Sequence, residues 1–206
     1  MGKEERRKAG AGVRERHETG KPRLRVFLAI FPPPEVQRVA AEAIEGLRAP
    51  GDRVSWVKRE NVHFTLRFLG EVGESGARRA AEAAAEIAPD HPAFDAALGT
   101  LGAFPDGRRA RVLWIGLSRG AEPMVALARS LEKALERRGF EREGRPFAAH
   151  LTIGRVREPG RDWSEALGRA TLPPAAWRVD RVLLIRSTLS PQGSRYVEIA
   201  AAPLPA

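Results

Sequence analysis

Hydrophobic and polar positions follow two rhythms along this chain, one typical of strands and one typical of helices. Short apolar or alternating runs predict strands at 24–30, 52–57, 62–69, 94–104, 111–117, 150–156, 181–189 and 195–201. Apolar residues at helical spacing predict helices from prolines 32–34 to residue 47, over 75–88 and over 121–138, with one more helical turn at 164–169. The mixture predicts an α+β protein.

A short motif occurs twice in matching surroundings, as His63-Phe64-Thr65-Leu66 and as His150-Leu151-Thr152-Ile153. Each copy follows a strand, an amphipathic helix and a polar loop, and each histidine lies 39 residues after the start of the strand that opens its unit (63 − 24 and 150 − 111). This repeat predicts a bilobal, duplicated fold. Two mainly antiparallel sheets are expected to face a central cleft, with helices packed on their outer faces.

Side chains two positions apart in a strand share a face, so each motif offers an imidazole beside a hydroxyl. His63 and Thr65 are expected on one face of their strand, and His150 and Thr152 on one face of theirs. Arg67 has the same parity as His63 and is expected beside it as a phosphate contact, with a solvated rim arginine as the equal alternative. Arg155 has the opposite parity to His150, so it reaches the site only if the strand ends or bulges near Gly154.

Two imidazoles suit a reaction that needs an acid and a base in one step, because histidine titrates near pH 6.5. Threonine hydroxyls and an arginine fork are suited to phosphoryl oxygens. A single His-x-Thr is more often structural, and only the matched pair favours phosphodiester chemistry. Catalytic zinc is the weaker alternative because no His-Glu-x-x-His pattern or obvious third ligand is present. No Walker-type loop or dinucleotide fingerprint occurs either, so we expect neither a cofactor nor a metal.

Composition narrows the class of protein. The chain has 206 residues, 43% of them hydrophobic, which is enough for a core, and it has no cysteine. Its formal net charge of +9 favours a polyanionic partner, although genomic base bias accounts for an arginine-rich composition equally well. Residues 1–22 are expected to form a disordered basic tail, and residues 23–206 a single domain. No apolar run approaches the ~20 residues that span a bilayer, so a cytoplasmic monomer that does not bind membranes is expected.

Longer stretches around the two motifs resemble the signature motifs of the 2H phosphoesterase superfamily. These stretches are Glu60-Asn61-Val62-His63-Phe64-Thr65-Leu66-Arg67-Phe68-Leu69-Gly70 and His150-Leu151-Thr152-Ile153-Gly154-Arg155. Within the superfamily the chain is similar to the RNA 2',3'-cyclic phosphodiesterases, also called 2'-5' RNA ligases. The similarity extends from Arg23 onward and includes Gly102-Ala103-Phe104-Pro105, Val112-Leu113-Trp114 and the closing Leu189-Ser190-Pro191-Gln192-Gly193 with Tyr196.

The resemblance implies metal-independent hydrolysis of a terminal RNA 2',3'-cyclic phosphate to a 2'-phosphomonoester. By residue match, His63 is implied as the proton donor to the departing 3'-oxygen and His150 as the proton acceptor that activates water. Thr65, Thr152 and Arg155 are implied as phosphate-binding residues. One departure is Ala149, where the family commonly has proline before the second histidine.

Three alternatives stay open from the sequence. A 2H enzyme acting on 2'-5' linked oligonucleotides or small cyclic nucleotides carries the same motifs, and ligation of RNA ends is a related side activity. A catalytically silent RNA-binding module is the alternative from another class. Two intact motifs argue against that module, because a protein that only binds RNA has no need for matched imidazoles.

Overall fold

The computed structural model describes residues 23–158, 160–191 and 193–206. The tail expected at residues 1–22 lies outside the described residues. The strands are β1 (Leu24–Ile30), β2 (Val54–Trp56), β3 (Phe64–Val72), β4 (Phe94–Phe104), β5 (Val112–Arg119), β6 (Leu151–Val156), β7 (Ala176–Val179), β8 (Arg181–Ser190) and β9 (Gly193–Pro203). The helices are α1 (Pro34–Leu47), α2 (Glu74–Ile87), α3 (Ala121–Arg137) and α4 (Ser164–Arg169), with 3-10 turns η1 (Arg59–Asn61) and η2 (Ala88–Asp90).

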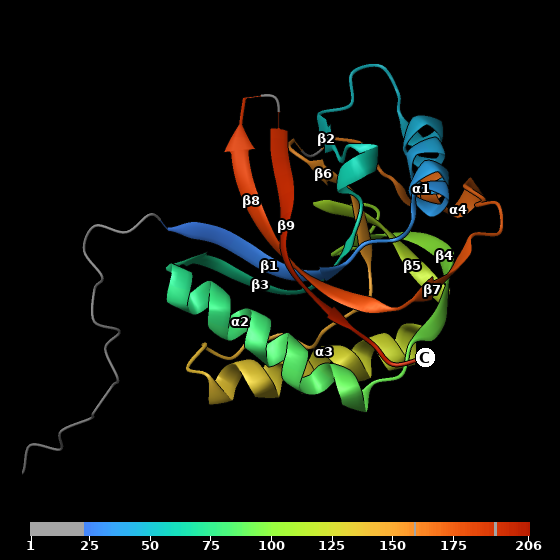
Figure 1. Ribbon diagram of the computed structural model, residues 1–206. Coiled ribbons are helices and arrows are strands. Elements are labelled where there is room, and N and C mark those ends of the chain that lie inside the picture. Colours follow the sequence, from blue (N-terminus) through green and yellow to red (C-terminus); the bar gives the residue numbers. More distant parts are fainter. Residues whose placement is uncertain (1–22, 159, 192) are drawn as a thin grey trace, which may run out of the picture.

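The strands form one curled sheet of nine strands in the order β7-β4-β5-β6-β3-β1-β8-β9, with β2 added beside β6 (Figure 1). Every strand pairing is antiparallel, and the prediction of an α+β protein built on antiparallel strands is confirmed. The two expected sheets are joined where β3 meets β6 at the pair Phe64–Leu151. The halves are therefore continuous through the two motif strands.

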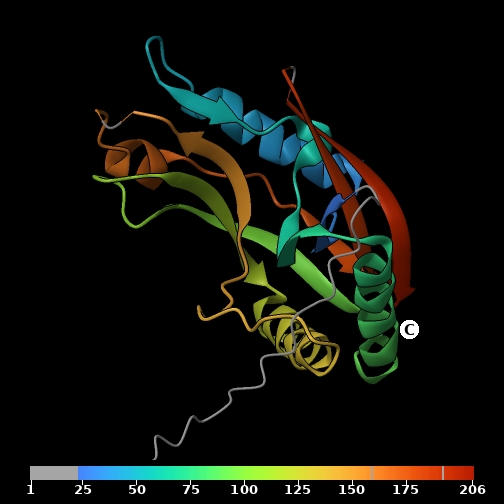
Figure 2. The same ribbon diagram turned by 90° about the vertical axis from the view of Figure 1, so that its left-hand side faces the viewer.

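Helices cover one face of the sheet. Helices α2 and α3 lie side by side across it, and α1 and α4 lie toward the other end (Figures 1 and 2). Helix α1 begins at Pro34, since proline fits the first helical turn, and it buries Val36, Val39, Ala40, Ile44 and Leu47 along one stripe. One continuous core lies between the helices and this face, and we call it the helix-side core.

The opposite face, which we call the open face, carries a small second cluster. Phe27, Ala29, Leu183 and Ile185 are buried there, and Phe31 and Tyr196 pack against them. Successive residues of β1 alternate between this cluster and the helix-side core, as the strand period requires. The open face is the one on which the candidate site lies.

The expected strands and helices are present, with shifted ends in several cases. The sequence predicted both motif histidines within their strands. In the structure β3 begins at Phe64 and β6 at Leu151, so each histidine lies one residue before its strand. Strand β7 was not predicted, because an alternation of four residues is too short to separate from a loop. Within the described part of the chain, no helix is long and apolar enough to cross a membrane.

Candidate active site

The pair Phe64–Leu151 sets the geometry of both motifs. Both side chains are buried in the helix-side core. In an antiparallel pair the flanking positions project from the opposite face, so Thr65 and Thr152 both point to the open face. His63 directly precedes Phe64, and His150 directly precedes Leu151, so the two histidines flank the same pair on its N-terminal side in each strand. The sequence prediction that the two motifs meet in one place therefore agrees with the register.

A β-bulge in β6 brings Arg155 to the open face. On β5, Trp114 pairs with Thr152, and its neighbour Leu113 pairs with Gly154. Ile153 of β6 therefore has no partner on β5 and is the extra residue. Leu113 and Ile153 are both in the helix-side core, and beyond the bulge Arg155 regains the parity of Thr152. The bulge near Gly154 on which this residue's role depended is present.

A second bulge at the equivalent place in β3 has the opposite consequence for Arg67. Ala29 pairs with Thr65, whereas Leu28 pairs with Arg67, so Leu66 is the extra residue. Leu28 and Leu66 belong to the helix-side core, and Arg67 shares their side of the sheet. The parity expectation that placed Arg67 beside His63 is therefore wrong, because the extra residue inverts the alternation.

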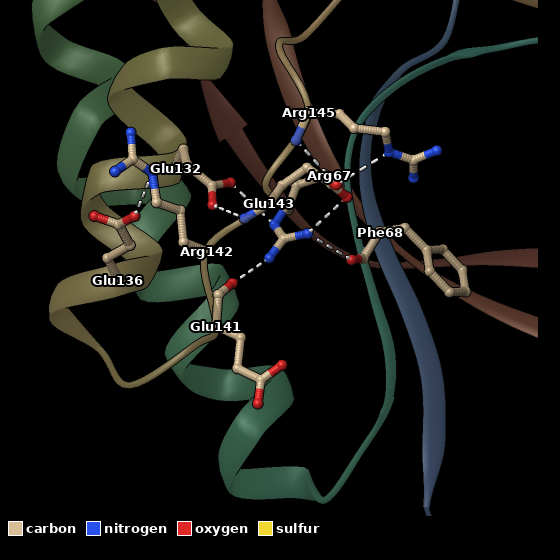
Figure 3. Close-up of polar contacts among 8 residues, drawn as sticks. All are labelled: Arg67, Phe68, Glu132, Glu136, Glu141, Arg142, Glu143 and Arg145. Carbon is tan, nitrogen blue, oxygen red and sulfur yellow. Dashed lines mark hydrogen bonds and ion pairs between the residues drawn. The ribbon is translucent and has the colours of Figure 1, made fainter.

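Arg67 is instead held by carboxylates and carbonyls of α3, of the segment that follows this helix and of β3 itself (Figure 3). Its Nε lies 3.0 Å from Oε2 of Glu132 on α3, and its Nη1 lies 3.4 Å from Oε2 of Glu143. The guanidinium also donates to the carbonyl oxygens of Glu141 and Phe68. Only 13% of the Arg67 side chain is exposed. Since its ion pairs and the hydrogen bonds of both Nη atoms are directed away from the open face, we leave Arg67 out of the phosphate-binding set proposed below.

The His63 ring is held on two edges and enclosed by aromatic rings. Its Nδ1 lies 2.7 Å from the carbonyl oxygen of Asn61, and its Nε2 lies 2.9 Å from Oγ1 of Thr65. Phe31 stacks on the ring at a centroid distance of 5.0 Å, and the centroids of Phe27 and Tyr196 lie 4.8 and 5.3 Å away. The imidazole therefore has little freedom to rotate.

Asn61 is a positioning residue that sequence reasoning missed. Its buried side chain donates from Nδ2 to the carbonyl oxygen of Ser194 on β9 at 2.8 Å. This bond connects η1 to the closing hairpin and fixes the carbonyl oxygen that accepts the hydrogen bond from Nδ1–H of His63. A buried asparagine just before the motif is the signal that could have revealed it, because buried amides are almost always bonded.

His150 is more open than His63. Its Nδ1 lies 2.8 Å from the carbonyl oxygen of Ala148, and Phe104 stands edge-on at a centroid distance of 5.1 Å. A carbonyl oxygen only accepts hydrogen bonds, so Nδ1 carries the proton in both histidines. In the neutral rings Nε2 is then the free basic nitrogen, and in His63 it accepts from the Thr65 hydroxyl. The two motifs thus present the same tautomer.

Burial lowers the pKa of His63 from 6.5 to about 4. The hydrogen bond to Asn61 raises this pKa, whereas the positive charges of Arg155 and His150 lower it further. Both of those groups are therefore close enough to repel a proton on His63. An anion placed among the three groups would remove that repulsion, so the site is electrostatically prepared for a negatively charged ligand.

A cavity of about 570 Å³ opens beside His63. Phe31 and Tyr196, which contact the His63 ring, form part of its wall, and the β8–β9 hairpin supplies most of the remainder. Its volume is in the range of small-molecule sites. Among the described residues, no group of three or more His, Asp or Glu side chains is placed to hold a metal ion.

Comparison with known proteins agrees with this geometry. Residues 32–190 match the 2'-5' RNA ligase superfamily. A protein of Thermotoga maritima named RNA 2',3'-cyclic phosphodiesterase is 35% identical over 173 residues, which cover 84% of this chain and 91% of that protein. The crystal structure of TT0787 of Thermus thermophilus has a TM-score of 0.73 at 28% identity, covering 88% of this chain and 98% of that one. Escherichia coli LigT complexed with 3'-AMP has a TM-score of 0.71 at 25% identity, covering 89% and 99%. The family resemblance inferred from the motifs is confirmed, and the chain belongs to the 2'-5' RNA ligase superfamily.

Proposed function

We propose that this protein hydrolyses the terminal 2',3'-cyclic phosphate of RNA to a 2'-phosphomonoester. The observation that carries the proposal is the matched pair of motif histidines, each with Nδ1 bonded to a carbonyl oxygen and with Nε2 as its reactive nitrogen. The name of the Thermotoga maritima relative and the 3'-AMP complex of LigT support the substrate class. The formal net charge of +9 fits a polyanionic substrate.

The proposed reaction is an in-line displacement at phosphorus. Nε2 of His150 takes a proton from water as the water oxygen attacks the cyclic phosphate. The P–O3' bond breaks, and Nε2–H of His63 gives its proton to the departing O3', so the product keeps the phosphate on O2'. One ring thus ends protonated and the other neutral, and exchange with solvent restores both.

The remaining groups have defined parts in this scheme. The hydroxyls of Thr65 and Thr152 donate to the non-bridging phosphate oxygens, and Arg155 neutralises the charge that develops on them. The cavity bounded by Phe31 and Tyr196 has room for the terminal nucleoside. Both proton transfers and the charge neutralisation have side chains assigned, so the proposed reaction uses no metal ion.

One chain supplies every group in this scheme, so we propose that a monomer built on residues 23–206 suffices. This part of the proposal rests on the completeness of the site. Size-exclusion chromatography with light scattering, together with turnover by a protein that begins at Arg23, tests it.

The central experiment follows the phosphate. The purified protein, with a chelator present, is incubated with an oligoribonucleotide that ends in a 2',3'-cyclic phosphate, and the product is compared with 2'- and 3'-phosphate standards. A 2'-phosphate is expected, whereas a 3'-phosphate contradicts the assigned leaving group. Activity that depends on a chelator-sensitive ion contradicts the metal-free scheme, and binding without turnover supports an RNA-binding module instead.

Two substitutions test the histidine roles. His63→Ala and His150→Ala are each expected to lower kcat by at least about a hundredfold, since positioned acid–base groups contribute on that order. His91→Ala is the matched control, because His91 follows η2 and takes no part in the site. Wild-type turnover in either motif variant would exclude the two-histidine mechanism.

A further inference from the structure

The duplicated bulges place different residues at equivalent positions on the open face. Beyond the bulge in β6 the first residue on this face is Arg155, and beyond the bulge in β3 it is Phe68. Phe68 pairs with Phe27, whose ring contacts His63, so Phe68 lies on the same face as the proposed site. In Figure 3, Phe68 and Arg67 point to opposite sides of β3. The second motif thus offers a cation where the first offers an aromatic ring.

Phe68 is unusually exposed for a phenylalanine in the middle of a strand. Its exposed fraction is 44%, and the guanidinium of Arg25 lies over its ring at 4.7 Å from the centroid. Arg25 and Phe68 together form what we call the platform. It presents two planar surfaces, the uncovered part of the ring and the outer face of the guanidinium. Unpaired RNA bases stack on aromatic rings and on arginine planes of this kind.

The position of the platform relative to the cavity fits two consecutive nucleotides. Phe68, Phe27, Ile185 and Glu198 are cross-strand partners in one row over β3, β1, β8 and β9. Ile185 and Glu198 line the cavity beside His63 at one end of this row, and Phe68 stands at the other. Neighbouring strands are ~4.8 Å apart, so Phe68 lies about 10 Å from Ile185.

Positive charge lies on the far side of the platform. Strands β1 and β8 separate beyond Val26 and Arg186, and they leave a notch of about 360 Å³ lined by Arg23, Arg25, Arg186 and one carboxylate, Glu71. Glu71 lies 4.0 Å from Nε of Arg23. Within residues 23–158, 160–191 and 193–206, Arg25 and Arg186 have no carboxylate partner. Arg25 therefore brings an uncompensated cation to the exposed ring, and Arg186, which pairs with Val26 and projects toward the helix side, lines the other side of the notch.

We propose that the platform and the notch form a second nucleotide subsite, which holds the base and the phosphate of the nucleotide 5' to the cyclic end. This inference rests on the proposed function and narrows the substrate to single-stranded RNA ends longer than one nucleotide. The base stacks on Phe68 and Arg25, and the phosphate that precedes it lies in the notch. Stacking requires only a planar base, and the charge contact requires only a phosphate, so these contacts are not expected to distinguish one base from another.

Substrate length provides the test. Wild-type kcat/KM is measured for a nucleoside 2',3'-cyclic phosphate and for a tetranucleotide ending in the same group, and the tetranucleotide is expected to be the better substrate. Phe68→Ala is expected to lower the ratio of the two kcat/KM values about 5- to 150-fold, the range for loss of one base–aromatic stack. Phe68→Trp is expected to keep the ratio. Ile199→Ala removes another exposed apolar side chain and serves as the control.

Arginine variants separate stacking from charge. Arg25→Lys keeps the charge and loses the plane, so it is expected to lower the ratio less than Arg25→Ala does. Arg169→Ala, on the exposed surface of α4, is the control. A ratio that does not change in Phe68→Ala, or an equal fall for both substrates, overturns the inference, as does a wild-type enzyme that does not distinguish length.

Binding gives a readout that does not need turnover. Fluorescence anisotropy measures the affinity of a labelled tetranucleotide that ends in a 2'-phosphate, and Phe68→Ala is expected to weaken it by a similar factor. If the wild-type protein hydrolyses neither substrate, the proposed function fails, and the anisotropy result still decides the subsite. Affinity that is unchanged in Phe68→Ala and in Arg25→Ala refutes the subsite.

Discussion

The clearest quantitative consequence of the site concerns the proton on His63. The difference between a pKa of 6.5 and one of about 4 corresponds to about 3 kcal/mol in favour of the neutral ring. At pH 7 roughly one free molecule in a thousand then carries the proton that a general acid must give away. Under the proposed mechanism the free protein therefore lacks the proton that His63 is to donate, and the bound substrate has to restore it.

We expect a bound phosphate to raise the pKa of His63 by about 1–3 units, the effect of an opposite charge within a few ångströms. The negative charge offsets the repulsion that Arg155 and His150 exert on the protonated ring. By linkage, phosphate then binds the protonated form about 10- to 1000-fold more tightly, so its affinity rises as the pH falls. Arg155→Gln is expected to raise the pKa of His63 in the free protein without restoring 6.5, because burial is the largest cause of the low value.

NMR titration of the histidine Cε1–H signals measures these values directly. The chain has four histidines, and His63→Gln assigns the signal of interest. Titrations are run without ligand, with a nucleoside 2'-monophosphate, and with sulfate, whose charge stays constant over the range. A midpoint near 6.5 in the free protein refutes the burial argument. A low midpoint that does not move when either anion binds refutes the role of the substrate.

Three further predictions concern stability. The unfolded chain binds a proton on His63 below pH 6.5, whereas the folded chain binds it only near pH 4. This residue therefore makes the free energy of unfolding fall by about 3 kcal/mol as the pH falls from 6.5 to 4. In urea denaturation the free energy of unfolding of His63→Gln is expected to depend less steeply on pH than that of the wild type. Arg67→Met leaves the mostly buried carboxylate of Glu132 without its cation, whereas Glu143 is exposed and keeps Arg145, so the change is expected to cost about 1–3 kcal/mol; Arg78→Met, which breaks an exposed helical pair, costs less than about 1 kcal/mol. Gly154→Ala puts a methyl group 2.9 Å from the Trp56 ring and is expected to cost about 1–3 kcal/mol in thermal melts, whereas Gly168→Ala has open space and costs nothing. The ion-pair argument is wrong if Arg67→Met is as stable as the wild type. The burial argument for His63 is wrong if the free energy of unfolding of His63→Gln depends on pH as steeply as that of the wild type. The steric argument is wrong if Gly154→Ala melts at the wild-type temperature.

Much of the fold could be read from hydrophobic periodicity, because most elements are long enough to show it. Helices α1, α2 and α3 each bury one stripe against the sheet, and that stripe is visible in the sequence. The His-x-Thr motifs could be found for the same reason, since apolar residues mark the buried parity of their strands. Strand β7 has four residues and could not be found by this means.

Orientation beyond the motifs could not be predicted by counting. The extra residues Leu66 in β3 and Ile153 in β6 invert the alternation just after each motif, and the residue types of Leu66 and Arg67 do not indicate the first of these bulges. Gly154 indicated the bulge in β6, because a glycine within a strand often marks a bulge. The contacts that hold the rings, from Asn61 and Ala148, come from backbone carbonyls, and any residue type supplies a carbonyl. Such contacts depend on tertiary packing and are not encoded in residue identity.

The surroundings of the two equivalent motifs differ in a way that fits the unequal roles proposed for them. His63 is enclosed by Phe27, Phe31 and Tyr196, whereas the only aromatic ring of the described residues in contact with His150 is that of Phe104. An enclosed ring excludes water from the bond that it protonates, and a more open ring admits the water that a base must activate. The bulges add to this difference, because they place the cation Arg155 on the His150 side and the planar Phe68 on the His63 side. The same backbone position thus carries a cation in the second motif and an aromatic ring in the first, which fits the roles proposed for His150 in activating water and for His63 beside the nucleoside. The duplicated strands thus supply matched imidazoles, and the aromatic surroundings of His63 favour its assignment as the acid.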